Sequence, residues 1–154
     1  MSMRSSFVYG YGFIVDEIYD NVLIEFIKNH MRTFCASDIE KEMYEEMLEY
    51  TKEEYDLEDF FESYSCDCTG MEGRGAVISN IISRETGIRF DYQSGDGECN
   101  SYPSVLFVES YPWNLNEKEK NLTVESLTEI LLPYVEELGL KKNDIDALEI
   151  EYYG

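Results

Sequence analysis

Residues 7–14 read FVYGYGFI, and this stretch decides the fold class. Aromatic side chains stand at every second position, at Phe7, Tyr9, Tyr11 and Phe13, so the stretch predicts a strand with one aromatic face. Glycines at alternate positions leave the other face nearly bare. We therefore expect a helix of the protein, or else a partner, to approach the backbone of that face closely.

The hydrophobic period changes directly after this strand. From Asp16 onward, apolar residues recur three and four positions apart, which predicts an amphipathic helix that Asp16 caps. His30 is the only histidine, and its place near the end of this helix indicates a capping or packing role and not a catalytic one. The stripe consists of Ile18, Val22, Phe26 and His30, with Leu23 and Ile27 beside it.

A strongly acidic run follows. Twelve carboxylates lie between Asp38 and Glu62, against only Lys41 and Lys52. The sequence SDIE at residues 37–40 has the form of a capping box, so we expect a second helix to begin there and a third, short helix to begin at Asp56. Their inner faces are predicted to carry Ile39, Met43, Met47 and Tyr50, and then Leu57, Phe60, Phe61 and Tyr64. Such helices would present one continuous acidic surface.

A strand pair is predicted in the second half of the chain. Residues 105–108 read VLFV, an unbroken apolar run that is typical of a buried central strand. Residues 88–92 alternate apolar and polar side chains, and we expect them to pair with 105–108 as an antiparallel hairpin. The alternation of residues 148–152 predicts a last strand.

Two further helices are expected around this hairpin. One begins near Val77 and ends at Gly87, and the other is capped by Thr123 and ends at Gly139, with a kink at Pro133. The order of elements predicts an α+β fold with about four mostly antiparallel strands, helices on one face, and the acidic helical segment between strand 1 and the central hairpin. With 44% hydrophobic residues and no internal repeat or linker, residues 1–154 predict a single domain.

Neither a secretory signal nor an apolar run long enough to cross a bilayer is visible, so we expect a cytoplasmic protein. The four cysteines, Cys35, Cys66, Cys68 and Cys99, are then expected to be free thiols. A zinc site made from all four is the alternative, although the spacing of Cys66 and Cys68 is tighter than zinc ligands usually show. We predict no metal and no cofactor.

No catalytic signature stands out, and we expect a protein that is not an enzyme. Carboxylates are so frequent that any two can resemble a general acid and base, and nothing marks a nucleophile beside His30. The glycine-rich stretch Gly70–Gly75, with Arg74, could form an anion cradle, but its spacing matches neither the Walker nor the dinucleotide fingerprint. A small ligand-binding domain that uses this stretch stays open as a further alternative.

The formal net charge of -21 excludes direct binding to nucleic acid or anionic membranes and favours a basic protein partner. Carboxylates at this density on helices can imitate the phosphate row of nucleic acid, while tyrosines among them supply rigid anchors. We expect the partner-binding residues to be Glu42, Glu45, Glu46, Glu49, Glu53, Glu54, Glu58 and Asp59, with Tyr44, Tyr50 and Tyr55 as anchors.

In size, charge and its texture of tyrosine and glutamate, the chain resembles the small acidic inhibitors that phages and mobile elements direct against nucleic-acid-handling defence enzymes, such as anti-CRISPR and anti-restriction proteins. The resemblance implies a non-enzymatic inhibitor that occupies the basic channel of a nuclease effector. An interaction or immunity module that neutralises a basic toxin with the same surface is the alternative. The null hypothesis is an acidic face that only keeps the protein soluble.

Overall fold

The computed structural model describes residues 5–16, 18–50, 60, 74–93, 104–108 and 112–153. Its centre is a four-stranded sheet with the strand order β2-β3-β1-β4, in which every neighbouring pair is antiparallel. The strands are β1 (Ser5–Ile14), β2 (Asp91–Gln93), β3 (Ser104–Val108) and β4 (Asp146–Tyr153). The predicted α+β fold with antiparallel strands is confirmed.

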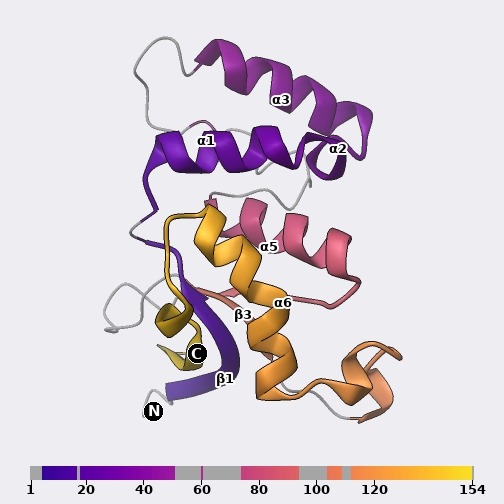
Figure 1. Ribbon diagram of the computed structural model, residues 1–154, viewed down its shortest axis with the longest axis vertical. Coiled ribbons are helices and arrows are strands. Elements are labelled where there is room, and N and C mark those ends of the chain that lie inside the picture. Colours follow the sequence, from indigo (N-terminus) through magenta and orange to yellow (C-terminus); the bar gives the residue numbers. More distant parts are fainter. Residues whose placement is uncertain are drawn as a thin grey trace.

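Helices lie between the strands in the chain (Figure 1). The α-helices whose bounds are described are α1 (Asp20–Asn29), α2 (Met31–Phe34), α3 (Asp38–Tyr50), α5 (Arg74–Thr86) and α6 (Val124–Glu137). Short 3-10 helices span Pro112–Asn114, Glu119–Asn121 and Lys142–Asp144. No helix in the described ranges combines the length and the apolar character that a bilayer span requires.

One face of the sheet carries the core. Phe13 of β1 is fully buried and lies opposite Val105 of β3, which is also fully buried. The hydroxyl of Tyr11 lies 2.9 Å from that of Thr128 in α6, and Gly75 of α5 lies against the ring of Tyr92 in β2. Helices α5 and α6 therefore cover the same face, as the sequence predicted.

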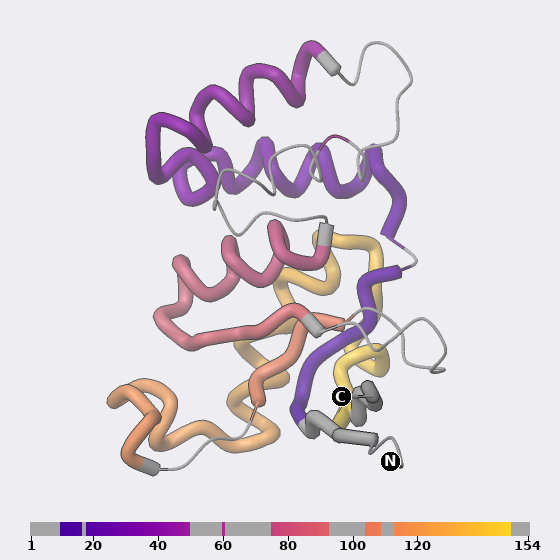
Figure 2. Tube along the Cα trace, turned by 180° about the vertical axis from the view of Figure 1, so that it is seen from behind, coloured from indigo at the N-terminus to yellow at the C-terminus, as the bar shows by residue number. Residues whose placement is uncertain are grey.

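The remaining helices form layers farther from the sheet (Figures 1 and 2). Helix α1 lies between α5 and α3, so α3 is the outermost layer at the end of the molecule away from the sheet. Buried residues of α1 and α2, Leu23, Phe26, Ile27 and Phe34, join these layers to the core. The acidic helix is thus positioned at one end of the molecule.

The bare face of β1 has a different neighbour from the one we expected. A Cβ atom at Gly10 would lie 2.7 Å from the carbonyl oxygen of Phe107, and one at Gly12 would lie 2.6 Å from Cα of Leu106. Both obstacles belong to β3, the adjacent strand of the same sheet. The prediction that a helix approaches these glycines is therefore wrong, because the close approach occurs between two strands. The approach of a partner to this face stays a prediction.

Helix ends follow the local sequence with one exception. Thr123 caps α6: its hydroxyl accepts from the backbone N–H of Ser126 at 3.1 Å, as predicted. Gly87 and Gly139, with φ of 75° and 82°, follow the ends of α5 and α6, where the left-handed conformation favours glycine. Asp16 does not cap a helix, because α1 begins only at Asp20 and residues 18 and 19 are not helical.

Replacing Gly12 by alanine should lower the free energy of unfolding by about 1–3 kcal/mol, since the new methyl group meets strand backbone that cannot move aside. Gly75→Ala is the matched control, and its loss of stability should be smaller. Its methyl group meets a side chain, the ring of Tyr92, instead of strand backbone, and alanine gains about 1 kcal/mol of helix propensity over glycine. Urea denaturation of both variants measures the difference. Equal losses would contradict the strand-to-strand explanation.

Glu119 closes the segment between β3 and α6. Its side chain is 1% exposed and accepts from the backbone N–H of Arg89 at 2.9 Å, from Nη2 of Arg89 at 2.7 Å and from the backbone N–H of Asn116 at 2.9 Å. The hydrogen bonds from Arg89, followed by those from backbone N–H groups, outweigh burial and lower the pKa of Glu119 to about 2. The Glu119 carboxylate therefore joins Arg89 and Asn116, and its negative charge is needed for these hydrogen bonds.

Because the pKa of Glu119 is depressed on folding, its contribution to stability is present above the unfolded pKa of 4.5 and is lost as the pH falls toward about 2. The stability difference between the wild type and Glu119→Gln should therefore be large at pH 5 and shrink between pH 4.5 and 2. Denaturation midpoints across this range measure it. Glu117→Gln, at a side chain that is 90% exposed, is the control and should show little difference at any pH.

Candidate functional site

Helix α3 divides its side chains between the core and the surface. The hydroxyl of Ser37 accepts from the backbone N–H of Glu40 at 3.3 Å, so the helix begins where the sequence predicted. Met43 and Met47 are fully buried against the core. This attachment fixes which side of α3 faces outward.

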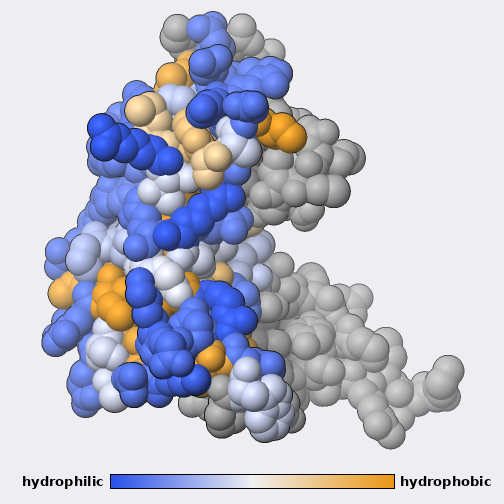
Figure 3. All heavy atoms as spheres, turned by 90° about the vertical axis from the view of Figure 1, so that its right-hand side faces the viewer, coloured by the Kyte–Doolittle hydropathy of each residue, from blue (hydrophilic) through white to orange (hydrophobic). Residues whose placement is uncertain are grey.

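Five carboxylates occupy that outward side. They are Asp38, Glu42, Glu45, Glu46 and Glu49, and all five are exposed. Successive residues of an α-helix are rotated by about 100°, so the five fall within an arc of roughly 100° on the side away from Met47. We call this set the acidic stripe. Figure 3 shows hydrophilic side chains at this end of the molecule, with some apolar ones between them.

The linear spacing of the acidic stripe is close to that of a nucleic-acid strand. From Asp38 to Glu49 the helix rises by about 16 Å, which places one carboxylate about every 4 Å along the axis. One strand of duplex DNA carries one charge per about 3.4 Å of axis. The stripe therefore has nearly the axial charge density of a phosphate row over this length.

Cations from the described part of the chain leave the stripe largely unneutralised. Lys41 lies beside it on α3 and is exposed. Among the described residues, no ion pair joins a cation to Asp38, Glu42, Glu45 or Glu46. Arg84, which reaches α3 from α5, pairs with Glu40 on the opposite side of the helix. The negative potential of the stripe thus faces solvent.

Glu40 is structural and does not belong to the acidic surface. It is 5% exposed, and its Oε1 accepts from Nη2 of Arg84 at 3.2 Å and from the hydroxyl of Ser37 at 3.0 Å. Nη1 of Arg84 donates to its other oxygen. The capping-box prediction is therefore only half right, because the Glu40 carboxylate binds Arg84 and the Ser37 hydroxyl.

Two apolar positions of α3 differ from the predicted pattern. Ile39 was expected on the inner side but is 46% exposed, because its position is close to the edge of the acidic stripe. Tyr44 was expected as a surface anchor but is partly buried, with its ring 6.2 Å from that of Phe34. Tyr44 therefore serves the core at least as much as the surface.

Several predicted site residues cannot be placed on this surface. Glu53, Glu54, Tyr55, Glu58 and Asp59 lie outside the described residues, as do Cys66, Cys68, Cys99, Gly70 and Gly73. Of the short helix predicted from Asp56, only Phe60 is described; it is helical and buried. Tyr50 ends α3, and its side chain is not described.

The last residues of the glycine-rich stretch Gly70–Gly75, which could form an anion cradle, belong to a helix. Helix α5 begins at Arg74, so Gly75 lies inside its first turn, where it is buried against the ring of Tyr92. Gly75 is therefore a packing residue and not a loop residue.

Cys35 is a free thiol, and its pKa is raised first by burial and then by the charge of Glu40, which disfavours the thiolate that a metal requires.

A second polar cluster, which the sequence did not reveal, surrounds His30. Its Nδ1 lies 2.8 Å from Oε2 of Glu85 in α5, and its Nε2 lies 2.8 Å from Oε2 of Glu137 in α6. Tyr134 donates to Glu85 at 2.9 Å, and the ring of His30 lies on that of Phe26 at 4.5 Å. The predicted packing role of His30 is confirmed, but no sequence signal linked it to carboxylates more than 50 residues away.

This cluster shifts the ionisation of its members. Burial by itself would lower the pKa of His30, but its hydrogen bonds to Glu137 and Glu85 and their charges outweigh burial and raise that pKa above 6.5. Burial by itself would raise the pKa of Glu85, but hydrogen bonds from Thr33, His30 and Tyr134 outweigh burial. The pKa of Glu85 is therefore lowered. Burial and the Glu85 carboxylate together raise the pKa of Tyr134.

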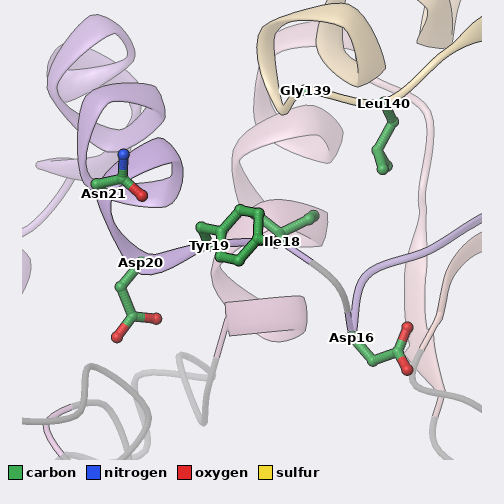
Figure 4. Close-up of a pocket in the computed structure, with 7 residues that line it drawn as sticks. All are labelled: Asp16, Ile18, Tyr19, Asp20, Asn21, Gly139 and Leu140. Atoms are coloured by element: carbon green, nitrogen blue, oxygen red, sulfur yellow. The ribbon is translucent and has the colours of Figure 1, made fainter.

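An open hollow of about 900 Å³ lies where the start of α1 meets the segment after α6 (Figure 4). Its lining includes Asp16, Asp20 and the exposed Tyr19, with Leu140 from the other side. The carboxylates of Asp16 and Asp20 lie apart and point in different directions, so they do not converge on one ligand. Within the described ranges, no group of three or more histidine, cysteine, aspartate or glutamate side chains could hold a metal ion.

Comparisons with other proteins add no family to this description. No family model matches the chain, and neither the curated proteins nor the solved structures include a significant match. The acidic stripe and the His30 cluster must therefore be interpreted from their own chemistry.

The division of α3 into structural and surface carboxylates predicts a contrast between two substitutions of the same kind. Glu40→Gln should lower the free energy of unfolding by about 1–2 kcal/mol, because Arg84 loses a charged partner that is almost fully buried. Glu46→Gln should change it by less than about 0.5 kcal/mol, or raise it, because it removes like-charge repulsion along the helix. Urea denaturation at pH 7 measures both. Similar losses in the two variants would contradict the division.

Proposed function

We propose that the protein is a non-enzymatic inhibitor that mimics nucleic acid and occupies the basic channel of a nucleic-acid-binding protein, such as a CRISPR effector or a restriction nuclease in the cytoplasm. The acidic stripe is the observation that carries this proposal. It combines one-sided placement on an outermost helix, nearly phosphate-like charge spacing and, within the described residues, few neighbouring cations.

Such a stripe would speed the association of the protein with a basic channel. A channel that binds nucleic acid is lined by lysine and arginine, and an opposing row of carboxylates gains the same long-range steering that a phosphate backbone gains. The net charge of -21 extends this attraction beyond the stripe itself. Binding of this kind is fast, and salt weakens it strongly.

Specificity requires contacts besides charge. Ile39, 46% exposed, lies at the edge of the stripe, and Met31, 43% exposed, lies in the preceding helix α2. These apolar side chains supplement the tyrosine anchors that the sequence suggested, of which Tyr44 is partly buried. We infer that the partner presents arginine or lysine over the stripe and an apolar contact beside it.

The proposal predicts that reversing the charge of the stripe abolishes inhibition. In the triple variant Glu42→Lys, Glu45→Lys and Glu49→Lys, each lysine would face a partner cation, so affinity for a susceptible nuclease should fall by about a hundredfold or more. The measurement is binding and nuclease inhibition at 50 and 200 mM salt, with a panel of CRISPR effectors and restriction nucleases. For the wild type, affinity should fall on the order of tenfold or more between these salt concentrations.

The control triple variant reverses Glu117, Glu129 and Glu136, which are exposed outside α3, and so reaches the same net charge. It should bind nearly as well as the wild type. Circular dichroism is the check that both variants are folded. Nucleic acid should compete with the protein for the nuclease. Equal losses of affinity in both variants would mean that only the net charge matters and not the position of the stripe. Binding with which nucleic acid does not compete would favour an interaction or immunity module.

A further inference from the structure

His30 stands where three parts of the structure meet. It is the residue between α1 and α2, and its carbonyl oxygen accepts from the backbone N–H groups of Thr33 at 3.0 Å and Phe34 at 2.9 Å. Its ring nitrogens reach Glu85 of α5 and Glu137 of α6. The side chains of His30, Glu85 and Glu137 are 16%, 24% and 27% exposed, so solvent can exchange protons with the cluster.

Two carboxylates on one imidazole select a protonation state. A neutral imidazole has one N–H and one lone pair, so it can donate to only one of the two oxygens, and its lone pair would face the other at 2.8 Å. The imidazolium has two N–H groups and satisfies both. We propose that His30 is a pH-sensitive latch, which fastens the α2–α3 arm (residues 31–50) to α5 and α6 while the ring is protonated and loosens it when the ring gives its proton to solvent.

Other contacts in the cluster also link the arm to the two carboxylates that bind His30. Thr33 of the arm donates to the same Glu85 oxygen at 2.5 Å, and its carbonyl accepts from Nη1 of Arg84 at 3.3 Å. Asn29 donates to the second oxygen of Glu137 at 3.1 Å. Loss of the histidine charge would thus leave Glu85 and Glu137 with neutral donors, while Arg84 remains paired with Glu40 of α3.

The charged and titratable groups around His30 set the pH range in which the latch is fastened. Glu85 and Arg84 come from α5, Glu137 and Tyr134 from α6, and Thr33 from α2. Because the pKa of His30 is raised on folding, the latch contributes fully below the unfolded pKa of 6.5 and is lost as the pH rises through the folded pKa. Because the pKa of Glu85 is lowered on folding, its contribution persists above 4.5 and is lost as the pH falls below that range. The latch is therefore strongest between pH 4.5 and 6.5.

The test uses the fact that the chain has one histidine. Its ring proton resonance reports the pKa of His30 directly by NMR titration of the intact protein. The wild-type pKa should lie above 6.5 and should fall toward 6.5 in Glu85→Gln and in Glu137→Gln. Glu136→Gln removes the same charge from the adjacent position of α6 and should leave the pKa of His30 nearly unchanged.

Release of the arm needs its own measurement. Amide hydrogen exchange at pH 6 and 8.5, corrected for intrinsic rates, should show several-fold faster exchange in residues 31–50 at the higher pH, with the strands unchanged. His30→Gln should show the faster exchange at both pH values. A wild-type pKa at or below 6.5, or exchange in the arm that does not depend on pH, would overturn the proposal. Both readouts are independent of what the acidic stripe binds.

Discussion

Repulsion among carboxylates is the constraint on which the rest of this structure depends. Thirty-three acidic side chains share the chain with twelve lysines and arginines, so most carboxylates cannot have a cationic partner. In the described structure, four carboxylates whose side chains are less than a third exposed have cationic partners: Arg84 for Glu40, Arg89 for Glu119, and His30 for Glu85 and Glu137. Each of these pairs joins elements that are far apart in the sequence, so the scarce cations also hold the layers together.

The carboxylates of α3 that remain exposed are gathered on one side of the helix. Met43 and Met47 fix the inner side of α3, and Glu40 is drawn to that side by Arg84. The acidic stripe is what these attachments leave outside. Its one-sided arrangement costs some helix stability through like-charge neighbours, and a partner with opposite charge would relieve that cost. This is the physical basis for proposing a basic channel as its target.

The strand and helix pattern was predictable because it depends on local periodicity. Alternation around Phe13, the apolar run at Val105 and the cap at Thr123 each specify an element without knowledge of its neighbours, and the structure contains all three elements. The predicted start of α1 is wrong, since Asp16 is a good cap by composition but residues 18 and 19 are not helical and α1 begins at Asp20. The approach of β3 to Gly10 and Gly12 could not be predicted, because a bare strand face does not reveal which backbone fills it.

By itself the sequence determined the fold class, the position of most elements and the excess of negative charge, since these depend on residue type and spacing along the chain. Only the tertiary structure decided the role of each carboxylate. Glu40 and Glu46 look alike in the acidic run, yet one is buried on Arg84 and the other faces solvent. The same holds for His30, whose two carboxylate partners come from α5 and α6. The electrostatics of a side chain depends on distance and burial, and packing between layers sets both.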